Sequence, residues 1–238
     1  MSGPDSPLFT GDPGEARVET EAAQRPLPRH IAVEGAIGVG KTTLARRLAE
    51  HLQYPLLLEP ATDNPFLDRF YMQGRRHALP TQLFFLLHRA RQMADLSRDD
   101  LVGPMLVSDF MMEKDDLFAR LTLDEHEYAL YRQIYEALDI YVPTPDLVVY
   151  LQAPVGVLQT RIRRRGIPYE RDIQFDYLER LNRAYTEFFH YYTDAPVLVV
   201  NAAEIDFAAN DTHFAALVQQ VREMDGLRQY FNANPTLL

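Results

Sequence analysis

Short apolar runs recur along most of this sequence, and longer stretches with helical spacing separate them. The runs are continuously apolar and only four or five residues long, which is typical of strands in a parallel sheet covered on both faces. The predicted strands cover residues 30–34, 55–59, 105–108, 147–151 and 197–200. The pattern therefore predicts a five-stranded parallel sheet.

The stretches between these runs carry apolar residues at the three- and four-residue spacing of amphipathic helices. They cover residues 44–52, 64–72, 80–97, 123–140, 154–165, 174–192 and 209–225. Regular alternation of strand and helix predicts a doubly wound α/β domain. Residues 1–29 are rich in Pro, Gly and Glu without periodicity, so we expect a flexible tail ahead of one domain at 30–238.

The segment that joins the first predicted strand to the first helix fits the pattern G-x-x-x-x-G-K-[ST]. It consists of Gly35, Ala36, Ile37, Gly38, Val39, Gly40, Lys41, Thr42 and Thr43. Glycines let backbone N–H groups surround phosphates, and the following helix adds the partial positive charge of its N-terminus. In such loops the lysine reaches the β- and γ-phosphates and the hydroxyl meets Mg²⁺, here Lys41 and Thr42. We therefore expect ATP and Mg²⁺ to bind here.

Composition narrows the classes of function. Among 238 residues, 47% are hydrophobic and 24% charged, which is normal for a globular domain. A net charge of −10 argues against nucleic-acid binding, because a phosphate backbone would be repelled. The absence of cysteine excludes disulfides and thiolate metal sites, and the seven histidines have no metal-ligand spacing. No apolar run approaches membrane-spanning length and no signal peptide is evident, so we expect a cytoplasmic protein without a membrane partner.

Carboxylates follow two of the predicted strands. Glu59 ends the second strand, and Asp109 follows the third. Ligands of open α/β sheets bind beyond the carboxyl ends of the strands, so both carboxylates should lie near the phosphate loop. Taken singly, each could also be a helix cap or a solvated turn.

An arginine-rich segment, residues 161–165, follows the fourth strand by one helix. Planar guanidinium groups stabilise the charge on a phosphoryl group in transfer, so the segment favours a kinase. A solvated basic helix end is the alternative. The sequence contains neither the N-K-x-D motif of GTPases nor an L-S-G-G-Q-like motif of transporter ATPases.

After the phosphate loop comes Glu59-Pro60, and further characteristic fragments follow at residues 64–71, 81–89, 161–170, 177–181 and 201–207. In their order and spacing these fragments together resemble the deoxynucleoside kinase family, whose members include deoxycytidine, deoxyguanosine and deoxyadenosine kinases. The resemblance spans roughly residues 30–225 and implies a P-loop nucleoside kinase fold with a homodimeric assembly.

The resemblance implies roles for particular residues. Glu59 would contact the 5′-hydroxyl as a candidate general base. Tyr71 and Glu170 would hold the 3′-hydroxyl, and Gln82 and Arg89 would bind the base edge. In addition, Arg161 and Arg165 would contact the transferring phosphoryl group. From the residues alone, Tyr71 could equally be a core or surface aromatic, and Gln82 and Arg89 could be exposed helix residues.

The sequence departs from the family pattern at two positions. The arginine expected after the third strand is missing from Ser108-Asp109-Phe110, so Asp109 becomes the candidate ligand of an Mg²⁺-bound water or an alternative base. An acid that meets the base in deoxycytidine kinases is replaced by Lys114. A lysine only donates, so it suits a purine N7 or O6, and both departures resemble bacterial purine deoxynucleoside kinases. The alternative is that Lys114 pairs with a neighbouring acid on a solvated turn.

The prediction is an ATP- and Mg²⁺-dependent kinase that phosphorylates the 5′-hydroxyl of a deoxynucleoside, with a purine favoured. One alternative is a nucleoside monophosphate kinase like thymidylate kinase, which usually carries an Asp-Arg pair after the third strand. Another is a non-catalytic ATP-binding regulator, which would need neither Glu59 nor the arginine-rich segment.

Overall fold

A computed structural model describes residues 26–96, 105–140, 142–205, 207 and 210–233, and its centre is a parallel sheet. In this part of the chain the sheet has six strands in the order β2-β3-β1-β4-β5-β6. Their bounds are β1 His30–Glu34, β2 Leu56–Leu57, β3 Leu106–Ser108, β4 Leu147–Gln152, β5 Val197–Asn201 and β6 Arg228–Phe231. All pairings are parallel, so the carboxyl ends of the strands meet at one edge.

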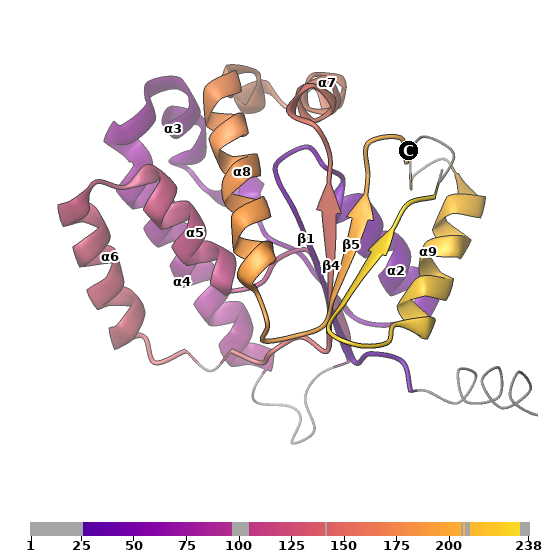
Figure 1. Ribbon diagram of the computed structural model, residues 1–238. Coiled ribbons are helices and arrows are strands. Elements are labelled where there is room, and N and C mark those ends of the chain that lie inside the picture. The colour runs from indigo at the N-terminus through magenta and orange to yellow at the C-terminus, as the bar shows by residue number, and fades with distance from the viewer. Residues whose placement is uncertain (1–25, 97–104, 141, 206, 208–209, 234–238) are drawn as a thin grey trace, which may run out of the picture.

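Helices cover the two faces of the sheet, and further helices lie to one side of it (Figure 1). Figure 1 shows α8 in front of the sheet and α2 behind it, with α4, α5 and α6 grouped beside α8. The α-helices are α2 Lys41–Leu52, α3 Leu67–Gln73, α4 Ala78–Leu96, α5 Glu113–Thr122, α6 Glu125–Ala137, α7 Val155–Arg165, α8 Phe175–Tyr191 and α9 Asp211–Glu223. Short 3₁₀ turns occur at Ala61–Asp63, Gly74–His77 and Pro168–Asp172.

The central strand β1 is the point at which the chain changes direction across the sheet. It pairs with β3 on one side and with β4 on the other. Its residues are all buried, including His30 and Glu34 at its two ends. A doubly wound sheet binds its ligand where the strand order reverses, so the segment after Glu34 lies at the expected place for a ligand.

The doubly wound fold and the positions of all five expected strands are confirmed, with a sixth strand added. β6 was not predicted because Arg228-Gln229-Tyr230-Phe231 is a half-polar run, as suits the edge of a sheet. Helix α5 was also not predicted, because its first turn holds Glu113, Asp115 and Asp116 and resembles a solvated turn.

Parts of the predicted organisation fall outside the described residues. Residues 1–25 of the expected tail lie outside them, as do residues 97 and 209 at the ends of two predicted helices. Within the described residues, no helix combines the length and apolar character needed to cross a bilayer.

Candidate active site

The phosphate loop connects β1 to α2 through backbone conformations that only glycine adopts easily. Gly40, the residue immediately before α2, has φ 109°. Gly35 has φ 141°, and a Cβ there would lie 2.5 Å from the carbonyl oxygen of Leu151. Lys41 donates from Nζ to the carbonyl oxygens of Gly35 at 2.6 Å and Ala36 at 3.3 Å. The ammonium group therefore lies over the loop, where phosphates would bind.

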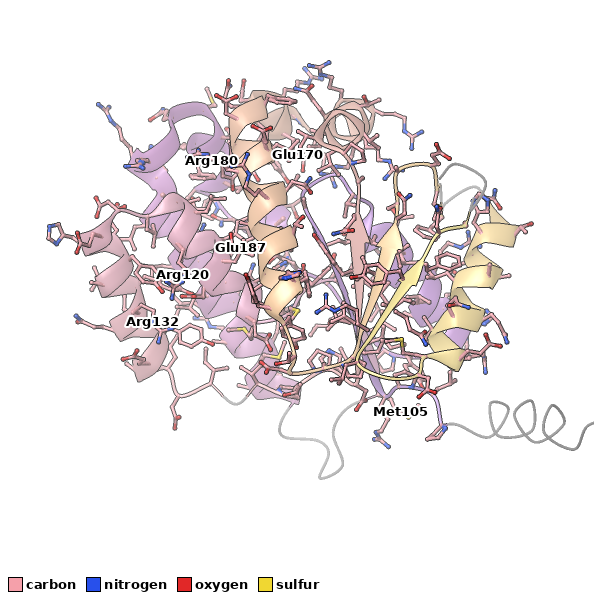
Figure 2. The ribbon with its side chains drawn as sticks, in the orientation of Figure 1. Met105, Arg120, Arg132, Glu170, Arg180 and Glu187 are labelled. Carbon is pink, nitrogen blue, oxygen red and sulfur yellow. The ribbon has the colours of Figure 1, made fainter. Side chains whose placement is uncertain are left out.

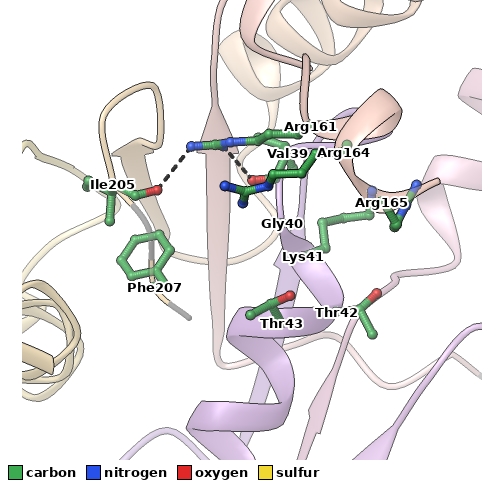
Figure 3. Close-up of a pocket in the computed structure, with 11 residues that line it drawn as sticks. Val39, Gly40, Lys41, Thr42, Thr43, Arg161, Arg164, Arg165, Ile205 and Phe207 are labelled. Atoms are coloured by element: carbon green, nitrogen blue, oxygen red, sulfur yellow. Dashed lines mark hydrogen bonds between the residues drawn. The ribbon is translucent and has the colours of Figure 1, made fainter. Parts of the chain in front are cut away.

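A cavity of about 290 Å³ opens beside this loop (Figure 3). Its walls combine the loop, the last turn of α7 and the segment after β5, which are far apart in sequence. The lining residues are Gly38, Val39, Gly40, Lys41, Thr42, Thr43, Arg161, Arg164, Arg165, Ile205 and Phe207. Three arginines and a lysine around one cavity make it suitable for a polyphosphate.

The arginines that were expected to contact the phosphoryl group have different partners. Arg161 donates to the carbonyl oxygens of Val39 at 3.1 Å, Ala202 at 2.7 Å and Ile205 at 3.0 Å. These bonds join the phosphate loop to the segment after β5, as Figure 3 shows for two of them. Arg165 instead pairs with Glu170, donating from Nε at 2.9 Å. The side chains of Arg161 and Arg165 both line the cavity, but Arg161 also joins the phosphate loop to the segment after β5.

The structure brings together Thr42 and Asp109, the two residues that the sequence analysis named as candidate metal ligands. The Thr42 hydroxyl donates to Asp109 Oδ2 at 2.6 Å. The second oxygen, Oδ1, accepts from the backbone N–H of Glu59 at 2.7 Å. The carboxylate of Asp109, which follows β3, thus connects the phosphate loop that follows β1 to the segment that follows β2.

Glu59 faces two cations. Arg89 donates to Glu59 Oε1 from Nε at 2.9 Å and also from a terminal nitrogen, and Lys114 donates to Oε2 at 3.1 Å. Burial alone would raise the pKa of Glu59, but Arg89 and Lys114 outweigh it and lower the pKa to about 2. Glu59 is therefore ionised across the physiological pH range.

Lys114 and Arg89 are buried. Each residue is only 2–3% exposed, so the alternative of a solvated turn for Lys114 and of an exposed helix position for Arg89 is wrong. Arg89 also pairs with the fully buried Asp115, and the second carboxylate near Lys114 is Glu34 at 3.8 Å. These cationic side chains can be buried because each of them is paired with carboxylates.

Tyr71 and Glu170 are the two residues expected to bind the 3′-hydroxyl. Tyr71 packs among Phe70, Tyr169 and Tyr177, with ring centroids 5.4–6.4 Å apart. Burial raises the pKa of the Tyr71 hydroxyl, and Tyr177 and Glu170 raise it further. The Tyr71 ring stacks on that of Tyr169, the residue that precedes Glu170. Glu170 is buried while its partner Arg165 lines the phosphate cavity, so one ion pair links the two regions.

Gln82 lies on α4, two turns before Arg89. It is 3% exposed, which excludes the alternative of an exposed helix residue. Its side-chain amide donates to the Thr122 hydroxyl at the end of α5 at 3.2 Å. A buried amide and a buried guanidinium on one helix can present a hydrogen-bonding edge to a planar base.

Three site residues were missed by the sequence analysis. Glu34 was interpreted only as the last residue of a buried strand. A charged residue at the end of an apolar run indicates a site residue, because such a residue is almost never fully buried without a partner. Asp115 was hidden in the acidic run that begins α5, and its burial follows only from the packing of α4 against α5. Arg164 was part of the arginine-rich segment but was given no role, although it lines the cavity.

The fold and the site define a class: a phosphate-loop phosphotransferase in which an arginine-rich helix and the phosphate loop line one cavity, with an ionised carboxylate nearby. The chain matches the family model described as "Deoxynucleoside kinase" over residues 31–224. It therefore belongs to the deoxynucleoside kinase family, and it is an enzyme that phosphorylates a deoxynucleoside with ATP.

Known relatives agree with this assignment. A deoxyguanosine kinase from Bacillus subtilis is 35% identical over 199 residues, covering 82% of this chain and 96% of the relative. A deoxyadenosine/deoxycytidine kinase from the same organism is 28% identical, covering 80% of this chain and 90% of the relative. Among solved structures, a deoxyadenosine kinase from M. mycoides with bound dATP has a TM-score of 0.71 at 25% identity, covering 81% of this chain and 98% of that chain.

Proposed function

We propose that this enzyme transfers the γ-phosphoryl group of ATP to the 5′-hydroxyl of a purine deoxynucleoside. The observation that carries the proposal is the position of Glu59. Its backbone is hydrogen-bonded to Asp109, which is bonded to Thr42 of the phosphate loop, and its side chain faces buried Arg89. An ionised carboxylate between a phosphate site and a base-edge site can accept a hydrogen bond from the attacking hydroxyl. When Arg89 turns from Glu59 toward the nucleoside, the basicity of Glu59 rises, so that it can take the proton.

Mg²⁺ fits the pair of oxygen ligands on Thr42 and Asp109. Mg²⁺ keeps several waters and is usually bound through one or two carboxylates together with substrate phosphates. A hydroxyl and a carboxylate 2.6 Å apart at the start of α2 match that requirement. When bound, the ion would neutralise charge on the β- and γ-phosphates.

Other residues would align the reactants. Lys41 and Arg165 would hold the phosphates. Arg161 would keep the phosphate loop and the segment after β5 in fixed positions relative to each other. Tyr71 and Glu170 would bind the sugar. Gln82 and Arg89 would bind the base edge, which requires Arg89 to exchange part of its contact with Glu59 for the nucleoside.

A purine preference rests on the relatives. The B. subtilis relative at 35% identity is a deoxyguanosine kinase, and a Dictyostelium discoideum relative at 31% identity is a deoxyadenosine kinase. The deoxyadenosine/deoxycytidine kinase among the relatives makes deoxycytidine the substrate to compare.

We also propose that the enzyme is a homodimer in the cytoplasm, where ATP is supplied. Leu87 on α4 and Leu130 on α6 are 42% and 46% exposed, and these helices contact each other. A paired copy could cover both side chains. Light scattering coupled to gel filtration should give twice the chain mass, and Leu87→Glu should reduce it to the chain mass.

A substrate panel tests the proposed function. With ATP and Mg²⁺, deoxyguanosine or deoxyadenosine should give the highest kcat/KM, followed by deoxycytidine, with thymidine and thymidine monophosphate poorest. Glu59→Gln should lower kcat by roughly 10²- to 10³-fold, whereas Glu50→Gln, on the exposed face of α2, should not. Preferred turnover of thymidine monophosphate would contradict the proposal, as would ATP binding with no transfer to any acceptor.

A further inference from the structure

Lys114 lies at the beginning of α5 and is one of only two lysines in the chain. It is 2% exposed, and lysines are almost never buried without a partner. Its Nζ is 3.1 Å from Glu59 Oε2 and 3.8 Å from Glu34 Oε1. The ammonium group therefore lies between two carboxylates at the ends of β1 and β2.

Both carboxylates belong to the phosphate side of the site. Glu34 directly precedes the phosphate loop and accepts from the backbone N–H of Gly35 at 3.2 Å. Glu59 is bonded through its backbone to Asp109, which in turn holds Thr42. Lys114 thus pairs with carboxylates that are connected to the phosphate loop, where the transferring phosphoryl group would lie.

The opposite end of α5 faces the base side. Thr122 accepts from Gln82, the candidate base-edge amide, at 3.2 Å. Eight residues separate Lys114 from Thr122, which is about 12 Å along a helix axis at 1.5 Å per residue. Helix α5 therefore has a phosphate end and a base end, and Lys114 occupies the phosphate end.

Glu34 has the contacts needed to keep Lys114 there. In addition to Gly35, it accepts from the Met111 backbone N–H at 2.9 Å and from the Tyr185 hydroxyl at 3.1 Å. It is completely buried. These donors fix a carboxylate that attracts Lys114, and the bond to Met111 fixes the segment that leads from Asp109 into α5.

We propose that Lys114 is a positioning residue for phosphoryl transfer: it holds the Glu59 carboxylate at the acceptor hydroxyl, and Glu34 holds Lys114 in place. Lys114 then does not discriminate between bases, in contrast to the base-edge role expected from the sequence. When Arg89 turns toward a bound nucleoside, Lys114 remains as the cation that orients Glu59. The inference rests on the proposed function, because it requires Glu59 to act on the 5′-hydroxyl.

Steady-state kinetics with ATP, Mg²⁺ and each of deoxyguanosine, deoxyadenosine and deoxycytidine test the inference. Lys114→Met should lower kcat about 10²-fold on all three substrates in the same ratio, because a misplaced reacting group can cost that much. The nucleoside KM should change less than about threefold, as expected when an interaction matters in the transition state. Lys114→Arg, which keeps the charge, should recover about tenfold of the lost kcat.

Arg120→Met is the matched control on the same helix. Arg120 is 64% exposed, pairs with Asp116 and lies near Arg132 of α6 (Figure 2), so this variant should match the wild type. Melting temperatures and binding of an ATP analogue show whether each variant is folded. If Lys114→Met does not fold, Lys114→Arg decides: a kcat loss at unchanged KM supports the inference, and a KM increase for purines alone overturns it.

A double-mutant cycle tests the part played by Glu34. Glu34→Gln alone should lower kcat on all three substrates, and in the Lys114→Met background it should cause little further loss, because Glu34 acts through Lys114. A loss that multiplies would overturn this part. Purine-selective loss in Lys114→Met, or no loss, would overturn the whole inference, whereas a wild type inactive on every deoxynucleoside would refute the proposed function instead.

Discussion

At the scale of single residues, burial sets the charge of the groups that meet the phosphates. Burial and the nearby Lys114 together lower the pKa of Lys41 to about 8, although Glu34, Asp109 and Glu59 act in the opposite direction. Lys41 is therefore mostly protonated at neutral pH but loses its charge as the pH rises through 8. A polyphosphate ligand favours the charged form.

Binding of ATP should consequently weaken in mild alkali. Between pH 7 and 9.5 the dissociation constant of a non-hydrolysable ATP analogue with Mg²⁺ should rise by at least tenfold, because the protonated fraction of Lys41 falls. Titration calorimetry at several pH values measures it. Lys41→Met should bind weakly at every pH with a much flatter profile, and a wild-type constant that does not change up to pH 9.5 would contradict this account.

His30 should make the folded state sensitive to acid. Burial lowers its pKa to about 4, with Asp146 opposing the shift, and its Nε2 lies 3.1 Å from the Ser108 hydroxyl. The unfolded chain binds a proton near pH 6.5 and the folded chain does not, so stability is lost as pH falls from 6.5 toward 4. At pH 5 this loss is about 2 kcal/mol for one such group.

Urea unfolding at pH 7.5 and pH 5 measures the effect. His30→Gln should lose less free energy of unfolding between the two pH values than the wild type does. His126→Gln, at an exposed position of α6, should behave as the wild type. Equal losses in all three proteins would show that His30 does not carry the acid sensitivity.

At the scale of elements, α7 places two similar arginines in different environments. Arg161 bonds backbone carbonyls of the phosphate loop and of the segment after β5, while Arg165 pairs with Glu170. The two could not be told apart before the structure, because both are arginines on one helix face. The partners of Arg161 lie in the phosphate loop and in the segment after β5, which only the tertiary fold brings near, whereas the partner of Arg165 lies in the turn at Pro168–Asp172 that follows α7.

The two arginines should therefore have different kinetic effects. Arg161→Ala should raise the KM for ATP about tenfold with a smaller fall in kcat, because the walls of the nucleotide cavity lose their link. Arg165→Ala should lower kcat by roughly 10²-fold, as expected for a cation at the developing phosphoryl charge. Initial rates with varied ATP and varied nucleoside decide, and identical KM and kcat changes in the two variants would contradict this division.

The elements that were predicted from sequence have strong local signals. The five buried strands are short apolar runs, and the phosphate loop has fixed glycine spacing. By contrast, α5 begins with charges that become buried only by pairing with Arg89 and Glu59, and β6 gains its strand partner from β5. For the same reason Glu59 and Asp109 could be placed from strand ends, whereas the pairing of Lys114 with Glu34 could not.

At the scale of the whole molecule, the parallel sheet brings Glu34, Glu59 and Asp109 to one edge from β1, β2 and β3. Helices α4 and α5 supply Arg89 and Lys114 from one side, and α7 supplies arginines above the phosphate loop. The site is therefore built from segments spread over residues 34–207, and its chemistry depends on the topology as a whole. The central consequence of this arrangement is that the nucleoside hydroxyl that contacts Glu59 is the one that receives the phosphoryl group.

The most direct test of this claim is the position of phosphorylation. The purified enzyme is incubated with ATP, Mg²⁺ and deoxyguanosine, or with analogues that lack either the 5′- or the 3′-hydroxyl, and the products are identified by mass spectrometry and ³¹P NMR. We predict the 5′-monophosphate from deoxyguanosine, slower 5′-phosphorylation of the analogue without a 3′-hydroxyl, and no product from the analogue without a 5′-hydroxyl. A phosphorylated product from that last analogue, or ATP hydrolysis without any nucleoside product, would contradict the account.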